Sequence, residues 1–178
     1  NFLGYLKIKK KPIVTVFSSI YNNGRYFEDA LKSLKRQTYP SDLIEHIIFD
    51  DCSNDNSAQI VSKLLIKKKH KCTFIKNKKN LGICKNQNKA MKMSRGKYFT
   101  TLHDDIWNEK RLEVLVSLIE RSNAKFAAVC SNFSIIDKNN KILVETFFSK
   151  NYSLPKNLFQ EFLLSDKLLI SSPTALIK

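Results

Sequence analysis

The feature of this sequence that most restricts its fold is a repeated unit: a short apolar run, a polar loop and a helical segment. The apolar runs 13–17, 43–49, 72–75 and 98–102 each have the length of a buried strand. Strands that alternate with helices of about ten to fifteen residues predict βαβ units, joined by right-handed crossovers into a mostly parallel sheet. We therefore expect an α/β fold with helices on both faces of the central sheet.

Apolar residues at helical spacing predict the helices between these strands. A first helix is expected over 26–35, a second after the capping group 55–57, and a third that Gly96 terminates. The polar stretch 18–24 has the composition of a turn, so the first strand should end before it. A further helix should begin near Asn108.

The last third of the chain is less regular. A strand is expected over 125–130, followed by a hairpin whose turn is 137–140. A short amphipathic helix over 155–164 and a strand pair over 168–177 complete the expected elements. The length of 178 residues, 43% of them hydrophobic, indicates one core and a single domain over residues 1–178.

Polar side chains follow three of the expected strands at the point where each strand ends. Ser19 and Tyr21 follow the first strand, Asp50–Asp51 the second and Asp104–Asp105 the fourth. Because the carboxyl ends of parallel strands lie on one edge of a sheet, these side chains should converge there.

The pair Asp104–Asp105 lies in the stretch Y-F-T-T-L-H-D-D-I-W at 98–107. Two adjacent acids in a loop are commonly a solvated turn or a helix N-cap. Here an apolar run precedes them, and a carboxylate pair beside a low-dielectric core is unfavourable unless a cation compensates its charge. Hard oxygen ligands suit Mg²⁺ or Mn²⁺, which take the rest of their shell from water and substrate phosphates. The implied ligand is a phosphorylated compound.

The chain is strongly basic, with 31 Lys and Arg residues, 16 Asp and Glu residues and a formal net charge of +15. This excess favours a polyanionic partner such as nucleic acid, anionic lipid or a phosphorylated substrate. The alternative is a general compositional bias toward Lys, Asn and Ile. No apolar run approaches the length of a membrane span, so we expect at most a peripheral membrane contact, through the basic clusters 7–11 and 67–71.

The four cysteines show no paired C-x-x-C spacing, and no signal peptide precedes them. Neither a zinc site nor a disulfide framework is therefore expected. We expect reduced thiols in a cytoplasmic protein.

Four segments resemble the successive motifs of the family 2 inverting glycosyltransferases, which share the GT-A fold. They are P-I-V-T-V-F-S-S-I-Y-N at 12–22, I-I-F-D-D-C-S-N-D-N-S at 47–57, N-L-G-I-C-K-N-Q-N-K-A at 80–90 and R-G-K-Y-F-T-T-L-H-D-D-I-W at 95–107. The resemblance covers 12–118 and weakens beyond it. It implies a Rossmann-like, mostly parallel sheet that binds a nucleotide-diphosphate sugar. The donor that the resemblance favours is a UDP-sugar.

Carried over residue by residue, the resemblance implies specific roles at the strand ends. Ser19 and Tyr21 would line the nucleotide pocket, with the tyrosine ring packed on the base. Asp51 would accept a hydrogen bond from the uracil ring nitrogen. Asp104 would contact the ribose, and Asp105 would ligate the Mn²⁺ or Mg²⁺ ion that bridges the diphosphate.

Three positions depart from the family pattern. His103 replaces the first acid of the D-x-D-like signature, and it is either an orienting residue for Asp105, a ribose contact or a satisfied, half-buried histidine. Lys85 is expected to contact phosphate, with a plain surface lysine as the alternative. Cys52 replaces the common small residue of D-D-G-S, which we interpret as a packing choice, while Asp50 and Ser53 support that turn.

The resemblance also implies the reaction, an inverting, metal-assisted transfer of a sugar to a glycan or lipid-linked acceptor. Such a reaction needs a carboxylate base near the acceptor hydroxyl. In the family this base lies in an acidic pair after a strand like 171–177, which we expect beyond Lys178. We therefore expect residues 1–178 to be the donor-binding part of a GT-A domain, truncated at its C-terminus.

Other classes of protein remain open. A nucleotidyltransferase on a similar sheet would carry a Gly-rich, Arg-containing loop, whereas S-S-I-Y-N-N-G-R at 18–25 has one Gly and one Arg in another arrangement. A basic polyanion-binding module would show steeply salt-dependent affinity without a metal requirement, but no specific nucleic-acid-binding motif is present. A degenerate transferase domain that acts as an interaction module is the third alternative.

Overall fold

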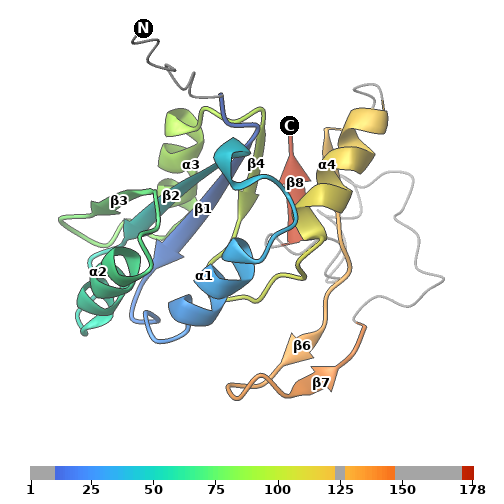
Figure 1. The fold of residues 1–178 in the computed structure, drawn as a ribbon. Coiled ribbons are helices and arrows are strands. Elements are labelled where there is room, and N and C mark those ends of the chain that lie inside the picture. The colour runs from blue at the N-terminus through green and yellow to red at the C-terminus, as the bar shows by residue number, and fades with distance from the viewer. Residues whose placement is uncertain (1–10, 123–126, 147–173) are drawn as a thin grey trace, which may run out of the picture.

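The computed structural model describes residues 11–122, 127–146 and 174–178. The strands of its main sheet are β1 (Val14–Ile20), β2 (Ile44–Asp50), β3 (Thr73–Lys76), β4 (Tyr98–Thr101), β5 (Ala128–Cys130) and β8 (Ala175–Ile177). Their order across the sheet is β3-β2-β1-β4-β8-β5 (Figure 1). β1 to β4 pair in parallel, whereas β8 is antiparallel to both β4 and β5. The expected mostly parallel sheet is confirmed.

Helices cover both faces of this sheet, as expected (Figure 1). The helices of the described residues are α1 (Phe27–Lys35), α2 (Ser57–Lys67), α3 (Ile83–Met93) and α4 (Arg111–Arg121), with a 3₁₀ turn η1 (Ser41–Leu43) before β2. The apolar sides of α1, α2 and α4 pack on one face, where they meet Val14, Val16 and Ile48. Ala90 of α3 packs on the other face, against Phe17 and Phe49.

The central strand β1 is buried along its whole length. Its neighbours cover both edges and helices cover both faces, which is why its sequence does not alternate between apolar residues and exposed polar ones. The ring of Phe17 packs edge-on against Phe49, with centroids 5.7 Å apart, and stacks on Phe99 at 6.2 Å. Burying each such side chain contributes about 1.5–3 kcal/mol to folding. This packing fixes the strands whose ends form the pocket described below.

The first strand is longer than the sequence predicts. Ser18 and Ser19, assigned above to a turn, continue β1 and pair with Ile48 and Phe49 of β2. A buried strand tolerates such hydroxyl groups when they find hydrogen-bond partners, and Ser18 does so with His46 at 2.9 Å. Polar composition alone therefore gave the wrong strand end.

Gly96 does not terminate α3, contrary to the prediction. The helix ends at Met93, and Ser94 already has extended backbone angles. Gly96 instead lies against β1, where an added Cβ would be 2.6 Å from the backbone nitrogen of Thr15. The glycine is required by close packing of two backbones and not by helix capping.

The expected hairpin forms from β6 (Ile135–Ile136) and β7 (Ile142–Val144), outside the main sheet (Figure 1). The predicted helix 155–164 lies outside the described residues, as do the ends of two predicted strands, 125–126 and 168–173. β8 is the last part of the predicted strand pair. Within the described ranges, no helix is long and apolar enough to cross a membrane.

Candidate functional site

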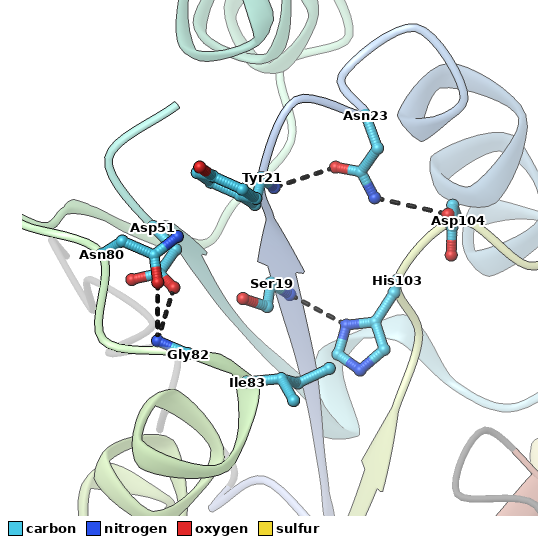
Figure 2. A pocket seen from close by; sticks show the side chains of 9 residues that line it. All are labelled: Ser19, Tyr21, Asn23, Asp51, Asn80, Gly82, Ile83, His103 and Asp104. Carbon is cyan, nitrogen blue, oxygen red and sulfur yellow. Dashed lines mark hydrogen bonds between the residues drawn. The ribbon is translucent and has the colours of Figure 1, made fainter. Parts of the chain in front are cut away.

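A pocket of about 430 Å³ opens where β1, β2 and β4 end (Figure 2). Its lining residues come from the loops after these strands and from the start of α3: Ser19, Tyr21, Asn23, Asp51, Asn80, Gly82, Ile83, His103 and Asp104. This is the edge at which α/β sheets place their ligands. The predicted convergence of polar side chains at one edge is therefore observed for four of the six, and Asp50 and Asp105 are not in the lining.

Four of the predicted nucleotide-binding residues line this pocket: Ser19, Tyr21, Asp51 and Asp104. Two predicted residues are not part of its lining. Lys85 is exposed on the first turn of α3, and Asp105 follows Asp104 directly in the chain. Their predicted contacts with phosphate and metal stay predictions.

Asp51 is the most extensively bonded acid of the pocket and is only 2% exposed. Its Oδ1 accepts hydrogen bonds of 2.9 Å from the backbone of Leu81 and the side chain of Asn77, and its Oδ2 accepts one of 2.9 Å from the backbone of Gly82. Burial acts to raise the pKa of Asp51, but hydrogen bonds from side-chain amides and backbone N–H groups outweigh burial and lower it. Asp51 is thus a fixed anion that anchors the loop before α3 to β2.

Gly82 is the residue at which this loop turns into α3. Its φ of 79° and ψ of 157° lie in a region that is open almost only to glycine. The N-terminus of the eleven-residue helix α3 therefore begins at the pocket wall, through Gly82 and Ile83. The free backbone N–H groups and the dipole of a helix N-terminus favour anions.

The turn after β2 is supported as predicted, but the role predicted for Cys52 is wrong. Ser53 Oγ donates a hydrogen bond of 2.6 Å to Asp50 Oδ1. Cys52 is exposed and has a φ of 63°. Its position requires a left-handed backbone conformation, which explains the preference for glycine and has nothing to do with packing.

Asn23 joins two predicted site residues across the pocket mouth (Figure 2). Its Oδ1 accepts a hydrogen bond of 3.0 Å from the backbone of Tyr21, and its Nδ2 donates one of 3.4 Å to Asp104 Oδ2. Tyr21 is 45% exposed at this mouth. Asn23 was not among the predicted site residues, because the N-N-G stretch after Tyr21 indicates a turn but not the partner of its amide.

His103 is half-buried, and its Nδ1 accepts a hydrogen bond of 3.0 Å from the backbone nitrogen of Ser19. Its ring packs edge-on against Phe17, with centroids 5.6 Å apart. Burial lowers the pKa of His103 and the Asp104 charge opposes this effect only in part, so the imidazole is neutral at pH 7. This bond gives Nδ1 a partner, but the buried Nε2 has none among the described residues, so the alternative of a satisfied histidine is met only in part. The alternative roles, orienting Asp105 or contacting the ribose, stay predictions.

Asp105 is exposed at the surface, but part of its carboxylate is desolvated by surrounding protein atoms, so ionising it carries a small cost. This desolvation raises its pKa, the adjacent Asp104 charge raises it further, and the Arg111 guanidinium acts in the opposite direction. Arg111 is itself held over the Trp107 ring, 4.1 Å from the centroid. A cation near Asp104 and Asp105 would remove this cost.

Among the residues that the structure describes, no group of three or more His, Cys, Asp or Glu side chains is arranged to hold a metal ion. Two adjacent carboxylates still fit Mg²⁺ or Mn²⁺, because these ions commonly bind one or two carboxylates and complete their shell with water and substrate phosphates. The donor set is therefore suited to an ion that arrives with a phosphorylated ligand.

The sequence of the chain matches a known family over nearly its whole length. The family model described as glycosyl transferase family 2 matches residues 15–177. This chain belongs to glycosyl transferase family 2. The resemblance seen in the four sequence motifs is confirmed.

Proteins with similar sequences come from organisms that are only distantly related to one another. The uncharacterized glycosyltransferase MJ1057 of Methanocaldococcus jannaschii is 34% identical over 158 residues, which are 86% of this chain and 53% of that protein. TuaG of Bacillus subtilis, a glycosyltransferase provisionally assigned to teichuronic acid biosynthesis, is 34% identical over 64% of this chain and 45% of its own length. The chain spans about half the length of these curated relatives.

Solved structures of glycosyltransferases share the fold. TarS of S. aureus in complex with UDP superposes with a TM-score of 0.60 at 24% identity, over 93% of this chain and 46% of that chain. The mannosyltransferase PcManGT of Pyrobaculum calidifontis, in complex with GDP-Man and Mn²⁺, gives a TM-score of 0.59 at 22% identity, over 74% of this chain and 37% of that chain. The predicted GT-A fold is confirmed.

Proposed function

We propose that this chain is the donor-binding part of a glycosyltransferase that moves a sugar from a nucleotide-diphosphate donor to a glycan or lipid-linked acceptor with inversion. The observation that carries the proposal is the convergence of Tyr21, Asp51 and Asp104 on one pocket at the carboxyl edge of the sheet. A fixed anion and an exposed aromatic ring suit the base of a nucleotide, and a second acid suits the hydroxyl groups of its ribose.

In this proposal the base is uracil. The ring of Tyr21 stacks on it, Asp51 accepts a hydrogen bond from its ring N–H, and Ser19 lines the wall beneath. The lowered pKa of Asp51 supports this role, because an acceptor must stay ionised at neutral pH. Among the structural neighbours TarS was solved with UDP and PcManGT with GDP-Man, so the choice of uracil rests on the family resemblance of the motif around Asp51 and not on the fold.

Asp104 contacts the ribose and Asp105 holds Mn²⁺ or Mg²⁺ at the diphosphate. When bound, such an ion neutralises the charge that develops on the leaving phosphate. The raised pKa of Asp105 supports this assignment, because a nearby cation would favour its ionised form. The N-terminus of α3 reaches the pocket through Gly82 and Ile83, and its dipole favours phosphate there. Lys85, exposed on the first turn of the same helix, adds a positive charge near this end.

The molecule that accepts the sugar is inferred from the family relationship. The assignment of TuaG to teichuronic acid biosynthesis supports a polysaccharide or its lipid-linked precursor as acceptor. We place the protein in the cytoplasm, with a peripheral contact to anionic membrane through the basic clusters 7–11 and 67–71.

Calorimetric titration with UDP and a UDP-sugar tests the proposal. We expect binding in Mn²⁺ and much weaker binding in EDTA, with Asp105→Asn abolishing the metal-dependent part. Glu109→Gln is the matched control, because Glu109 is an exposed acid outside the pocket lining. Equal affinities in Mn²⁺ and EDTA for both wild type and Asp105→Asn would rule out the metal role. Salt-dependent binding of any polyanion without preference for UDP would favour the basic interaction module.

A further inference from the structure

The regular pattern of backbone hydrogen bonds between β1 and β4 is interrupted at the pocket. Phe17 and Thr101 are partners in this parallel pair, and the backbone nitrogen of Leu102 donates to the Phe17 oxygen at 2.8 Å. In the regular pattern the next bond would run from the Ser19 nitrogen to the Leu102 oxygen. The Ser19 nitrogen instead donates to His103 Nδ1 at 3.0 Å, and the Leu102 oxygen accepts from the Ser18 hydroxyl. Two side chains thus replace one backbone bond.

The His103 contact defines the tautomer of this ring. A backbone N–H group can only donate, so His103 Nδ1 must be the acceptor and the proton of the neutral ring must be on Nε2. Nε2 is buried and has no hydrogen-bond partner among the residues that the structure describes. The ring is thus held by one hydrogen bond through Nδ1 and by its contact with Phe17.

The Ser18 contact is supported by a buried chain of side chains. Because the Ser18 hydroxyl donates to Leu102, it accepts from His46 Nε2 at 2.9 Å. His46 Nδ1 then accepts from His70 Nε2 at 2.8 Å. Ser18 is 0% exposed and His46 is 2% exposed. This chain holds the carbonyl group immediately before His103 in a fixed orientation.

The break lies directly between the two halves of the pocket. Ser19 belongs to the wall formed by β1, and His103 immediately precedes Asp104 on the wall formed by β4 (Figure 2). If the backbone ladder continued, β1 and β4 would stay in register through these residues. With the side-chain bonds the two strands can separate, and the bond between Ser19 and His103 still connects the segment of Asp104–Asp105 to β1.

We propose that His103 is a positioning residue for nucleotide binding, which fixes Asp104–Asp105 relative to Ser19 through its Nδ1 acceptor. This inference rests on the proposed function, because it is the donor nucleotide that the positioned acids bind. It assigns His103 no contact with the nucleotide. Its role is to hold one wall of the pocket against the other.

Three variants of His103 test this role. In His103→Asn the side-chain oxygen lies near the position of Nδ1 and can still accept from Ser19, whereas His103→Leu has no acceptor. His103→Gln is polar, but its amide lies farther from the backbone, near the position of Nε2. We expect UDP affinity in Mn²⁺ to fall about tenfold in the Leu and Gln variants, the equivalent of one hydrogen bond, and to fall less than threefold in the Asn variant.

Amide hydrogen exchange at Ser19, followed by NMR, supplies a readout that does not depend on nucleotide. It should become faster in the Leu and Gln variants and stay slow in the Asn variant. Thermal melts identify which variants are folded, and the Gln variant replaces the Leu variant if the latter fails to fold. Unchanged UDP affinity in the folded Leu or Gln variant, or equal losses in Asn and Leu, would overturn the positioning role. Failure of the wild type to bind UDP would instead overturn the proposed function. In that case slow hydrogen exchange of the Ser19 amide would still show whether His103 accepts its hydrogen bond.

Discussion

The backbone amide of Gly82 donates a hydrogen bond of 2.9 Å to Oδ2 of Asp51. This bond connects the end of β2 with the first residues of α3, which are distant in the sequence. Together with the bonds from Leu81 and Asn77, it means that Asp51 holds one wall of the pocket in place in addition to lining it. The same carboxylate would therefore combine a structural role with the proposed contact to the base.

Replacing Asp51 should affect both roles. We expect Asp51→Ala to lower the free energy of unfolding by about 1–3 kcal/mol, because buried donors lose their acceptor. It should also weaken UDP binding even in EDTA, because the base contact does not involve the metal. Urea unfolding and calorimetry measure the two effects. An Asp51→Ala protein that binds UDP in EDTA as the wild type does would show that the carboxylate does not contact the base.

Lys85 should contribute to phosphate binding although it is not part of the pocket lining. We expect Lys85→Ala to weaken UDP binding roughly fivefold, the size of one exposed charge contact, and to leave uridine binding unchanged. Lys92→Ala is the matched control, because Lys92 is exposed at the other end of the same helix. Equal effects of the two substitutions would mean that only the net charge of the chain matters.

Buried histidines should make the fold sensitive to mild acid. Burial lowers the pKa of His46 well below 6.5, and burial together with Lys35 lowers the pKa of His70 to about 4. Between pH 6.5 and 4 the unfolded chain therefore binds protons that the folded protein does not, and stability decreases as the pH falls. We expect Tm to fall by on the order of 5 °C between pH 7 and 5.

The variant His70→Gln isolates this effect. A glutamine amide can still donate to His46 but does not titrate, so the dependence of Tm on pH should become weaker. The measurement stops at pH 5, because below about pH 4 the carboxylates with lowered pKa, such as Asp51, also lose their stabilising contacts. A Tm that is constant from pH 7 to 5 in the wild type would contradict the buried neutral pair.

Two glycines should be required for different reasons. In Gly96→Ala the new Cβ would lie 2.6 Å from the Thr15 nitrogen, and we expect a loss of about 1–3 kcal/mol in stability without a change in UDP affinity. In Gly82→Ala no atom lies within 4 Å of the new Cβ, but the φ of 79° is strained for alanine. We expect a loss of about 1–3 kcal/mol there too, accompanied by weaker UDP binding.

Chemical denaturation and calorimetry on the same two variants separate these causes. The comparison is informative because Gly82 lines the pocket and Gly96 does not. A Gly96→Ala protein of wild-type stability would mean that β1 and the segment before β4 are not closely packed. Unchanged UDP affinity in Gly82→Ala would mean that the loop before α3 adjusts without cost.

Much of the fold and four of the nine residues that line the pocket follow from local features of the sequence. The length and periodicity of the apolar runs identified the strands, and the polar residues after them identified Ser19, Tyr21, Asp51 and Asp104. This succeeds because a strand that ends in polar residues is a local property, and the topology of a parallel sheet then brings such ends to one edge.

Residues whose role depends on a distant partner were not predictable in this way. Asn23 and Asn77 carry their functional contacts through their side-chain amides, and a sequence does not say which carboxylate an amide will meet. The left-handed backbone angle at Cys52 was not predictable either, because the residue there is not the glycine that usually marks such an angle.

By itself, the sequence determined the repeated βαβ units and placed acids where strands end, because burial and backbone preference act over a few neighbouring residues. Only the tertiary structure decided that β8 lies between β4 and β5, and that Ser19 meets His103 across 84 positions of sequence. Hydrogen-bond partners of this kind depend on how far two strands have separated in space, and that distance is set by the packing of the whole sheet.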